Sequence, residues 1–253
     1  MKMEHSDSTN KYMTYRGEKC EVLSAAICPT HGTYPQVLMS PTLGTFGFAG
    51  GCPECRRERK EREAYGALAI PPRFQNKTFR NFIVVDNSQR AVCDFMYHYC
   101  MHADEVCESG QSLIFLGRPG TGKTHLACAT LTEFRHFGHT GLFTSVARMI
   151  RTIRETWGTQ ESERAAIDRF SSVDLLVIDE VGVQAGSDNE RNILFSVLNE
   201  RYENVKPTIL ISNETLSSFK DFIGERIFDR FRENGGRAFV FDWPSFRGSK
   251  GQA

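Results

Sequence analysis

A phosphate-binding loop between a predicted strand and a predicted helix constrains the fold of this chain most strongly. Residues 117–124 read Gly-Arg-Pro-Gly-Thr-Gly-Lys-Thr, which fits the pattern G-x4-G-K-T. An apolar stretch at 112–116 precedes the loop and predicts a strand, and the amphipathic residues after it predict a helix. Helix N-termini bind phosphate because their first backbone N–H groups lack partners within the helix and the helix dipole attracts anions. The sequence therefore predicts an α/β domain that binds the phosphates of a nucleotide.

The residue types in this loop fit the chemistry of ATP binding. Glycines let backbone N–H groups wrap around the phosphates. The ammonium of Lys123 places a positive charge beside the β- and γ-phosphates, and the hydroxyl of Thr124 is expected to coordinate Mg²⁺. The loop residues expected to bind ATP and Mg²⁺ are Gly117, Pro119, Gly120, Thr121, Gly122, Lys123 and Thr124.

An acidic pair ends a second apolar strand, which is predicted at 173–179. A continuous apolar run is typical of a strand buried on both faces of a parallel sheet, and ligands bind at the carboxyl ends of such strands. We expect Asp179 to hold Mg²⁺ through water and Glu180 to polarise the water that attacks the γ-phosphate.

Two further strands indicate how the sheet is ordered. A predicted strand at 141–146 separates the strand of the loop from the acidic strand along the chain. After a predicted helix at about 187–204, another strand at 207–212 ends at Asn213. In P-loop ATPases with an additional strand, that strand lies between the other two, and a polar residue at its end contacts the γ-phosphate or the attacking water. Asn213 fits this position, and it also fits an ordinary turn at a strand end.

Arginines cluster around a predicted helix at about 224–234 and a last predicted strand at 237–242. They are Arg226, Arg230, Arg232, Arg237 and Arg247. An arginine near the end of that helix is placed to contact the γ-phosphate of a neighbouring subunit as an arginine finger. About eleven residues follow the last strand, too few for the helical lid that usually closes over the nucleotide in ATPases of this kind. We therefore expect an open site whose full activity needs a neighbour or a partner.

A second motif, near the N-terminus, predicts a metal site. Cys28 and His31 are followed by Cys52 and Cys55 in the pattern C-x2-H-x20-C-x2-C. A two-residue spacer lets each pair bind one ion from a tight turn, and three thiolates with one imidazole favour tetrahedral Zn²⁺. Because these four ligands leave no coordination position open, we expect the zinc to be structural.

The motifs divide the chain into three parts. Residues 1–65 are expected to form the zinc-knuckle module, with a hairpin between the ligand pairs and a charged helix after them. Residues 66–80 are expected to be a linker, and residues 81–253 the ATPase domain. A partner protein and DNA are both open as the contact of the zinc module.

Composition limits the class of protein further. Basic and acidic residues number 31 each, which argues against a protein that coats nucleic acid by bulk charge. The chain has no run of about 18 apolar residues and no secretory signal, so we expect a cytoplasmic protein with reduced cysteines and no membrane contact. Cys93, Cys100 and Cys107 recur every seven residues in a helix-like stretch and are expected, like Cys128, to pack in the core.

Four segments occur in order along the chain: Gly-Arg-Pro-Gly-Thr-Gly-Lys-Thr-His-Leu-Ala, Asp-Leu-Leu-Val-Ile-Asp-Glu-Val-Gly-Val-Gln, Gly-Glu-Arg-Ile-Phe-Asp-Arg and Phe-Asp-Trp-Pro-Ser-Phe-Arg. With Ile-Pro-Pro-Arg-Phe-Gln-Asn-Lys-Thr-Phe at 70–79, they closely resemble the DnaC-type helicase loaders over about residues 70–248. The resemblance implies a RecA-like AAA+ core, a parallel five-stranded sheet with helices on both faces and no C-terminal lid. By position, it implies that Arg230 is the arginine finger, Asn213 the first sensor and Arg247 the second sensor.

The same resemblance implies the partners. It implies binding of ATP, of single-stranded DNA and of a ring-shaped replicative DNA helicase, in a homo-oligomer or a mixed helicase–loader assembly. The best-known members have a metal-free helical segment where this chain has its Cys-His motif. Binding of the helicase by residues 1–65 is therefore a hypothesis that rests on domain order.

Other functions stay open at the level of sequence. One is an IstB-like ATPase that assists a transposase on duplex DNA, and another is a zinc-bearing adaptor that binds ATP with little hydrolysis. The Val-Gly-Val-Gln and Phe-Asp-Trp-Pro-Ser-Phe-Arg segments favour the loader. The basic segment 148–154, with Trp157 close behind, fits a surface for single-stranded DNA and equally a solvated helix face.

Overall fold

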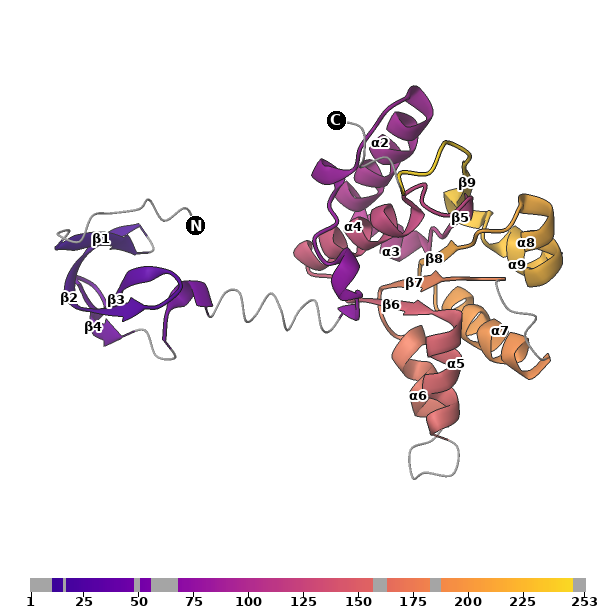
Figure 1. Cartoon of the computed structure of the whole chain (residues 1–253). Helices are drawn as coiled ribbons and strands as arrows, with labels where there is room; N and C mark the ends of the chain where they lie inside the picture. Colours follow the sequence, from indigo (N-terminus) through magenta and orange to yellow (C-terminus); the bar gives the residue numbers. More distant parts are fainter. Residues whose placement is uncertain are drawn as a thin grey trace. The chain divides into compact units, whose positions relative to one another are not determined.

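The computed structural model describes residues 11–15, 17–47, 51–55, 68–156, 163–182 and 188–247 of the chain. The chain falls into two compact units that divide between Ala64 and Tyr65. Each unit has a sheet of its own (Figure 1). Within the described ranges, no helix has both the length and the apolar character needed to cross a membrane.

The first unit is built on a four-stranded antiparallel sheet in the order β1-β2-β3-β4. The strands are β1 (Tyr12–Tyr15), β2 (Glu18–Cys28), β3 (Gly32–Ser40) and β4 (Gly44–Gly47). Cys20 and Leu38 are fully buried, and Val22 pairs with Leu38 across the β2–β3 ladder. The β3–β4 hairpin lies between the two ligand pairs as predicted, whereas β1 and β2 are additions to the prediction.

The second unit is built on five parallel strands in the order β6-β7-β8-β5-β9. They are β5 (Leu113–Gly117), β6 (Gly141–Ser145), β7 (Leu175–Asp179), β8 (Thr208–Ile211) and β9 (Arg237–Phe241). Since β8 lies between β7 and β5, the additional strand occupies the predicted place. The parallel five-stranded sheet confirms the predicted fold class.

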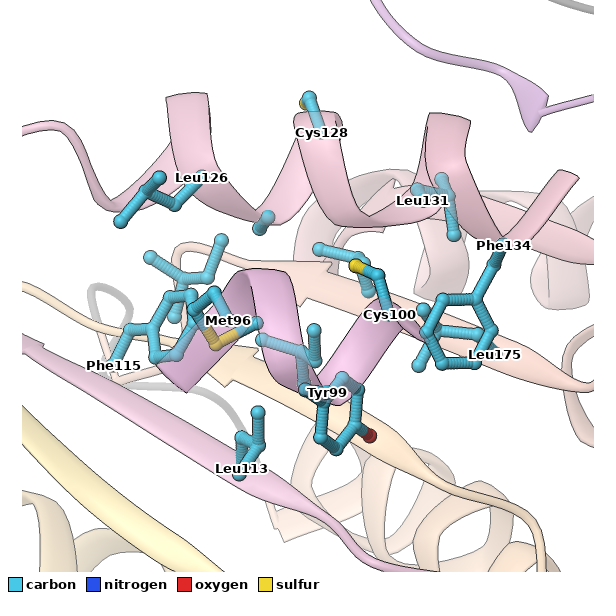
Figure 2. Close-up of a cluster of buried hydrophobic side chains, with 14 of the residues drawn as sticks. Met96, Tyr99, Cys100, Leu113, Phe115, Leu126, Cys128, Leu131, Phe134 and Leu175 are labelled. Carbon is cyan, nitrogen blue, oxygen red and sulfur yellow. The ribbon is translucent and has the colours of Figure 1, made fainter. Parts of the chain in front are cut away.

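Helices cover both faces of this sheet because alternate strand residues point to opposite sides. Leu113 and Phe115 of β5 pack into one core, and Ile114 and Leu116 pack into the other. The first core is formed with α2 (Asn87–Met101), α3 (Ala103–Ser109) and α4 (Lys123–His136). Figure 2 shows Met96 and Tyr99 of α2 beside the strands in this core.

The second core lies on the opposite face of the sheet. The helices that form it are α5 (Val146–Glu155), α6 (Glu163–Ser171), α7 (Asp188–Glu203), α8 (Leu216–Ile223) and α9 (Glu225–Arg230). Short 3-10 turns occur at Pro72–Phe74, Phe79–Asn81 and Glu233–Gly235.

The cysteines of the second unit pack as predicted, although the helix that carries them is broken. Cys100 and Cys128 are buried in the first core, and Cys93 and Cys107 pack against it from partly buried positions. The helix-like stretch breaks at His102, whose backbone (φ −113°, ψ 36°) leaves the helical region between α2 and α3.

The helix predicted at 224–234 is shorter in the structure. It begins at Glu225 and ends at Arg230. Asn234 and Gly235 have positive φ angles of 53° and 82°, which turn the chain into β9 instead of continuing the helix.

Candidate functional site

The phosphate-binding loop requires glycine at three positions for space as well as for backbone angle. Gly117, Gly120 and Gly122 have φ angles of 127°, 83° and 97°. A Cβ atom at Gly117 would collide with the backbone of Phe241, and one at Gly120 would collide with the side chain of Ser245. A Cβ at Gly122 would lie 2.6 Å from the ring of Phe82. The loop is therefore packed tightly on its outer side.

Lys123, the first residue of α4, places its ammonium group inside the loop. Its Nζ donates hydrogen bonds to the carbonyl oxygens of Gly117, at 2.5 Å, and Arg118, at 2.8 Å. Burial, together with the nearby charge of Arg247, lowers the pKa of Lys123 to about 8, although the carboxylate of Asp179 acts in the opposite direction. The amine lies where loops of this kind place a charge beside phosphates.

Thr124 and Asp179 come together across the sheet edge. The Thr124 hydroxyl donates to Oδ2 of Asp179 at 2.8 Å, and the backbone N–H of Glu180 donates to Oδ1 at 2.7 Å. Burial raises the pKa of Asp179 above its usual range, and these two hydrogen bonds oppose that rise. A hydroxyl beside a carboxylate is the kind of oxygen pair that Mg²⁺ prefers.

The loops after β7 and β8 are fastened to each other at the same edge. The backbone N–H of Val181 donates to Ile211, at 2.9 Å, and the hydroxyl of Ser212 donates to the carbonyl of Val181, at 2.5 Å. Glu180, an exposed residue, has a φ angle of 62°, a conformation uncommon for residues other than glycine. Asn213 follows Ser212 and is exposed. The structure thus brings the loop, the acidic pair and Asn213 to one edge. The sequence prediction missed the buried hydroxyl of Ser212, which joins the loops after β7 and β8 at this edge.

The chain after β9 also returns to the phosphate-binding loop. The indole Nε1 of Trp243 donates to the carbonyl of Thr121 at 2.8 Å, and the backbone N–H of Phe246 donates to the carbonyl of Gly120 at 3.0 Å. Arg247 is exposed, and its Cγ lies 3.1 Å from the position of a Cβ on Gly120. Arg247 is therefore beside the loop, and Trp243 is a contact that the sequence prediction missed.

A segment before α2 covers the other side of the loop. Phe82 is buried, and its ring lies 5.2 Å from the ring of His125, edge to face. Nε2 of His125 lies 2.9 Å from the carbonyl oxygen of Thr78. Burial lowers the pKa of His125, which favours the neutral ring at this contact. The predicted linker thus packs, at its end, on the N-terminal half of α4.

Arg230 is not part of this edge. It ends α9, where its Nη1 donates to Oδ1 of Asn199 at 2.6 Å and its guanidinium lies 4.4 Å from the ring centre of Tyr202. It lines a cavity of about 260 Å³ together with Ser112 and Thr208, which lie at the amino ends of β5 and β8. The structure therefore places Arg230 at the opposite edge of the sheet from Lys123.

The four predicted metal ligands of the first unit come together. Sγ of Cys28, Cys52 and Cys55 and a ring nitrogen of His31 all lie within 4.8 Å of one another. Cys28 Sγ is 3.5 Å from Cys55 Sγ, and Nδ1 of His31 is 3.7 Å from Cys28 Sγ and 3.8 Å from Cys52 Sγ. A tetrahedral ion with metal–sulfur bonds of about 2.3 Å separates its sulfur ligands by roughly 3.8 Å, so the residues fit zinc.

The electrostatics of this cluster also suit a metal. Backbone N–H groups of His31 and Thr30 lower the pKa of Cys28 to about 6, so this thiol ionises readily. Metal ions bind the thiolate form of cysteine. The cluster is therefore able to supply at least one ligand that is already deprotonated near neutral pH.

Helix α5 presents basic residues on its outer face. Val146, Met149, Ile150 and Ile153 are its buried residues. Arg148 and Arg151 are exposed, and Arg154 forms an ion pair with Glu190 at 3.1 Å. Trp157, the aromatic residue of the proposed DNA surface, lies outside the described residues.

Comparisons of the sequence with known proteins identify relatives that bind ATP or load helicases. The family described as IstB-like ATP binding protein matches residues 56–230. The replicative helicase loader DnaC of Escherichia coli (strain K12) is 32% identical over 192 residues, which are 76% of this chain and 77% of that protein. DnaC of Buchnera aphidicola subsp. Schizaphis graminum is 34% identical over 190 residues, 74% of this chain and 76% of that protein.

A solved structure is similar as well. The crystal structure of the DnaC helicase loader matches with a TM-score of 0.61 and 24% identity, over 67% of this chain and 99% of that one. This likeness shows the fold and agrees with the predicted parallel α/β core.

Proposed function

The chain belongs to the DnaC/IstB-like family of ATP-binding proteins, and on this premise we propose that it is an ATP-dependent loader of a replicative hexameric helicase. It binds the helicase and single-stranded DNA and delivers the helicase when replication starts. The observation that supports this proposal most is the gathering of the loop, Asp179, Glu180 and Asn213 at one sheet edge, in a chain that is similar to helicase loaders over three quarters of its length.

The residues of this edge divide the work of ATP hydrolysis. The ammonium of Lys123 exchanges its two carbonyl acceptors for the oxygens of the β- and γ-phosphates. Thr124 and Asp179 would hold Mg²⁺, which neutralises phosphate charge when it is bound. Glu180, exposed at the strand end, orients and polarises the attacking water, and Asn213 contacts that water or the γ-phosphate.

Arg230 acts on the nucleotide of a neighbouring subunit. Its position at the opposite sheet edge removes it from the nucleotide of its own chain. Asn199 and the ring of Tyr202 restrain the guanidinium, while the cavity beside it leaves it accessible. Hydrolysis is therefore slow in a single molecule and faster in an assembly that supplies Arg230 in trans.

The remaining surfaces contact the partners. The outward arginines of α5, Arg148 and Arg151, bind the phosphates of single-stranded DNA. The first unit, with Zn²⁺ held by its Cys-His cluster, docks on the helicase, because it occupies the place before the ATPase unit.

A pull-down with the replicative helicase of the same host tests the proposal. The protein is offered to the helicase with and without ATP, beside a Lys123→Ala variant. We expect a complex whose yield changes with ATP for the native protein and not for the variant. Deleting residues 1–64 is expected to abolish the complex, and recovery of the helicase by the shortened protein would sink the docking role of the first unit.

A second candidate follows from the name of the matched family, IstB-like ATP binding protein. In this case the chain assists a transposase on duplex DNA. No helicase complex, together with ATP-dependent binding to duplex DNA, would favour this function and leave the ATP chemistry unchanged.

A further inference from the structure

The segment after β9 contacts the phosphate-binding loop from its outer side. Two hydrogen bonds join them: Trp243 Nε1 to the carbonyl of Thr121, at 2.8 Å, and the backbone N–H of Phe246 to the carbonyl of Gly120, at 3.0 Å. The side chain of Ser245 fills the space over Gly120 that a Cβ would need. Residues 243–247, here called the C-terminal strap, therefore contact two consecutive peptide groups of the loop.

The C-terminal strap is anchored firmly at its first residue. Trp243 is only 4% exposed, and its ring centre lies 4.8 Å from that of Phe241, the last residue of β9. Phe241 in turn pairs with Gly117 at the end of β5, where the loop begins. The indole is therefore fixed by the sheet and the core, so its hydrogen bond restrains the position of the Thr121 carbonyl in the loop.

The geometry of the peptide bond gives these two hydrogen bonds a consequence for nucleotide binding. In a trans peptide the C=O and the N–H point in opposite directions. The carbonyl of Gly120 shares its peptide with the N–H of Thr121, and the carbonyl of Thr121 shares its peptide with the N–H of Gly122. Fixing both carbonyls toward the C-terminal strap therefore directs both N–H groups to the inner side of the loop, where phosphates bind.

We propose that Trp243 is a positioning residue for nucleotide binding: through the C-terminal strap it holds the N–H groups of Thr121 and Gly122 in the orientation that binds phosphate. This inference rests on the ATP site proposed above. Such pre-organisation strengthens binding because less conformational freedom is lost when the phosphates arrive. The same strap carries Arg247 to the loop, so one segment both orients two N–H donors of the loop and places a cation beside it.

Replacing Trp243 by Phe tests the proposal, since the ring can still pack on Phe241 while the N–H donor is lost. We expect ATP to bind about fivefold more weakly, the effect of one ordinary hydrogen bond. Calorimetric titration of the full chain with ATP and Mg²⁺ measures this. KM for ATP is expected to rise while kcat changes little, because the donors contact the phosphates before and during the reaction.

Tyr99→Phe is the matched control. Tyr99 is a buried aromatic residue whose hydroxyl donates to the carbonyl of Gln111 at 2.7 Å, at the amino end of β5 and away from the loop. It should lower the melting temperature as Trp243→Phe does, and leave ATP affinity unchanged. Native affinity in Trp243→Phe, or equal losses in both variants, would overturn the proposal. If Lys123→Ala also bound ATP normally, the ATP site itself would be wrong rather than the role of the strap.

A second pair of variants tests the proposal independently, in case Trp243→Phe does not fold. Phe246→Pro removes the N–H that binds the carbonyl of Gly120, whereas Phe246→Ala removes the ring and keeps the N–H. We expect the Pro variant to bind ATP several-fold more weakly than the Ala variant. Equal affinity in the two would show that this tie does not orient the loop.

Discussion

The amine of Lys123 combines burial with a charge, and this determines how the empty protein responds to pH. Its side chain is 5% exposed, and burial lowers its pKa from 10.5 to about 8. Between these two values the unfolded chain holds more protons at this residue than the folded chain does. By linkage, stability contributed at Lys123 therefore rises as pH increases from about 8 to about 10.5.

Lys123→Met isolates this effect. Urea unfolding of the nucleotide-free proteins is measured at several pH values, and the difference in unfolding free energy between native and variant is followed. Above pH 8, we expect the free energy of unfolding of the native protein to increase relative to that of the variant by about 1 kcal/mol per pH unit. The difference cancels the contribution of the buried cysteines, whose raised pKa values make the protein less stable as pH rises. If the free energies of unfolding of the two proteins changed with pH in parallel, the lowered pKa of Lys123 would be contradicted.

At the scale of elements, one buried arginine joins α7 to the strands β7 and β8. The side chain of Arg201 is 1% exposed and makes six hydrogen bonds. Its acceptors are the carbonyl oxygens of Phe170, Ser171, Val173, Asp174 and Pro207 and the hydroxyl of Thr208. The carbonyls of Phe170 and Ser171 lie at the end of α6, and the others lie just before β7 and β8, so Arg201 supplies buried donors where these elements meet.

Arg201→Met is therefore expected to destabilise the protein by about 3 kcal/mol or more, because several buried carbonyls lose their donor together. Arg164→Met is the control, since Arg164 is 69% exposed and pairs with Asp168 and Glu200 at the surface. Its cost should stay below about 1 kcal/mol. Denaturant unfolding of both variants checks this, and similar losses in the two would contradict a special role of Arg201.

The strands of the second unit could be predicted within two residues, because each is an apolar run bounded by polar or turn residues. β1 and β2 could not, since neither Tyr12–Tyr15 nor Glu18–Cys28 shows a regular alternation of polar and apolar residues. The end of α9 also escaped prediction, because α9 stops at Arg230 and the chain passes through a separate 3-10 turn at Glu233–Gly235, which no apolar pattern marks.

Metal removal is a test at the scale of the first unit. The described part of this unit has few buried residues. A shared zinc ion would join Cys28, at the end of β2, and His31, just after it, to Cys52 and Cys55. We expect about one zinc per chain, and we expect a chelator to release it and abolish amide protection in the strands β2, β3 and β4. ATP binding by the second unit should persist, because that unit has cores of its own.

Two single substitutions control this experiment. Cys52→Ser is expected to lose zinc without chelator. Cys93→Ser removes a partly buried thiol of the second unit and should keep the zinc. Metal content measured on all three proteins decides, and full zinc in Cys52→Ser would exclude the proposed ligand set.

For the whole molecule, short motifs predicted which residues share the nucleotide edge but not which segments fold back onto it. Lys123 and Asp179 could be paired because the loop and the acidic strand have known places in a parallel sheet. The return of Trp243 to Thr121 joins residues that are far apart in sequence, and no local pattern encodes it. The fully buried side chain of Arg201 was hidden for the same reason, as a charged residue in a helix usually faces water.

The distance of Arg230 from its own phosphate-binding loop leads to the last expectation. Lys123 lies at the carboxyl end of β5, whereas Arg230 lies beside the residues that precede β5 and β8. If hydrolysis needs both groups, they must come from two molecules that meet through unlike surfaces. Lys123→Ala and Arg230→Ala are each expected to lose ATPase activity in the presence of helicase and single-stranded DNA.

Mixing the two inactive variants should restore part of the activity. An Arg230→Ala subunit keeps an intact nucleotide site, and a neighbouring Lys123→Ala subunit supplies its intact Arg230. In an equal, random mixture, roughly a quarter of all subunit interfaces pair the intact nucleotide site with the intact Arg230. Arg232→Ala, which changes an exposed arginine just beyond α9, should stay active alone. A mixture that remains as inactive as its components would show that Arg230 does not act between subunits, because the recovery depends on groups supplied by different chains.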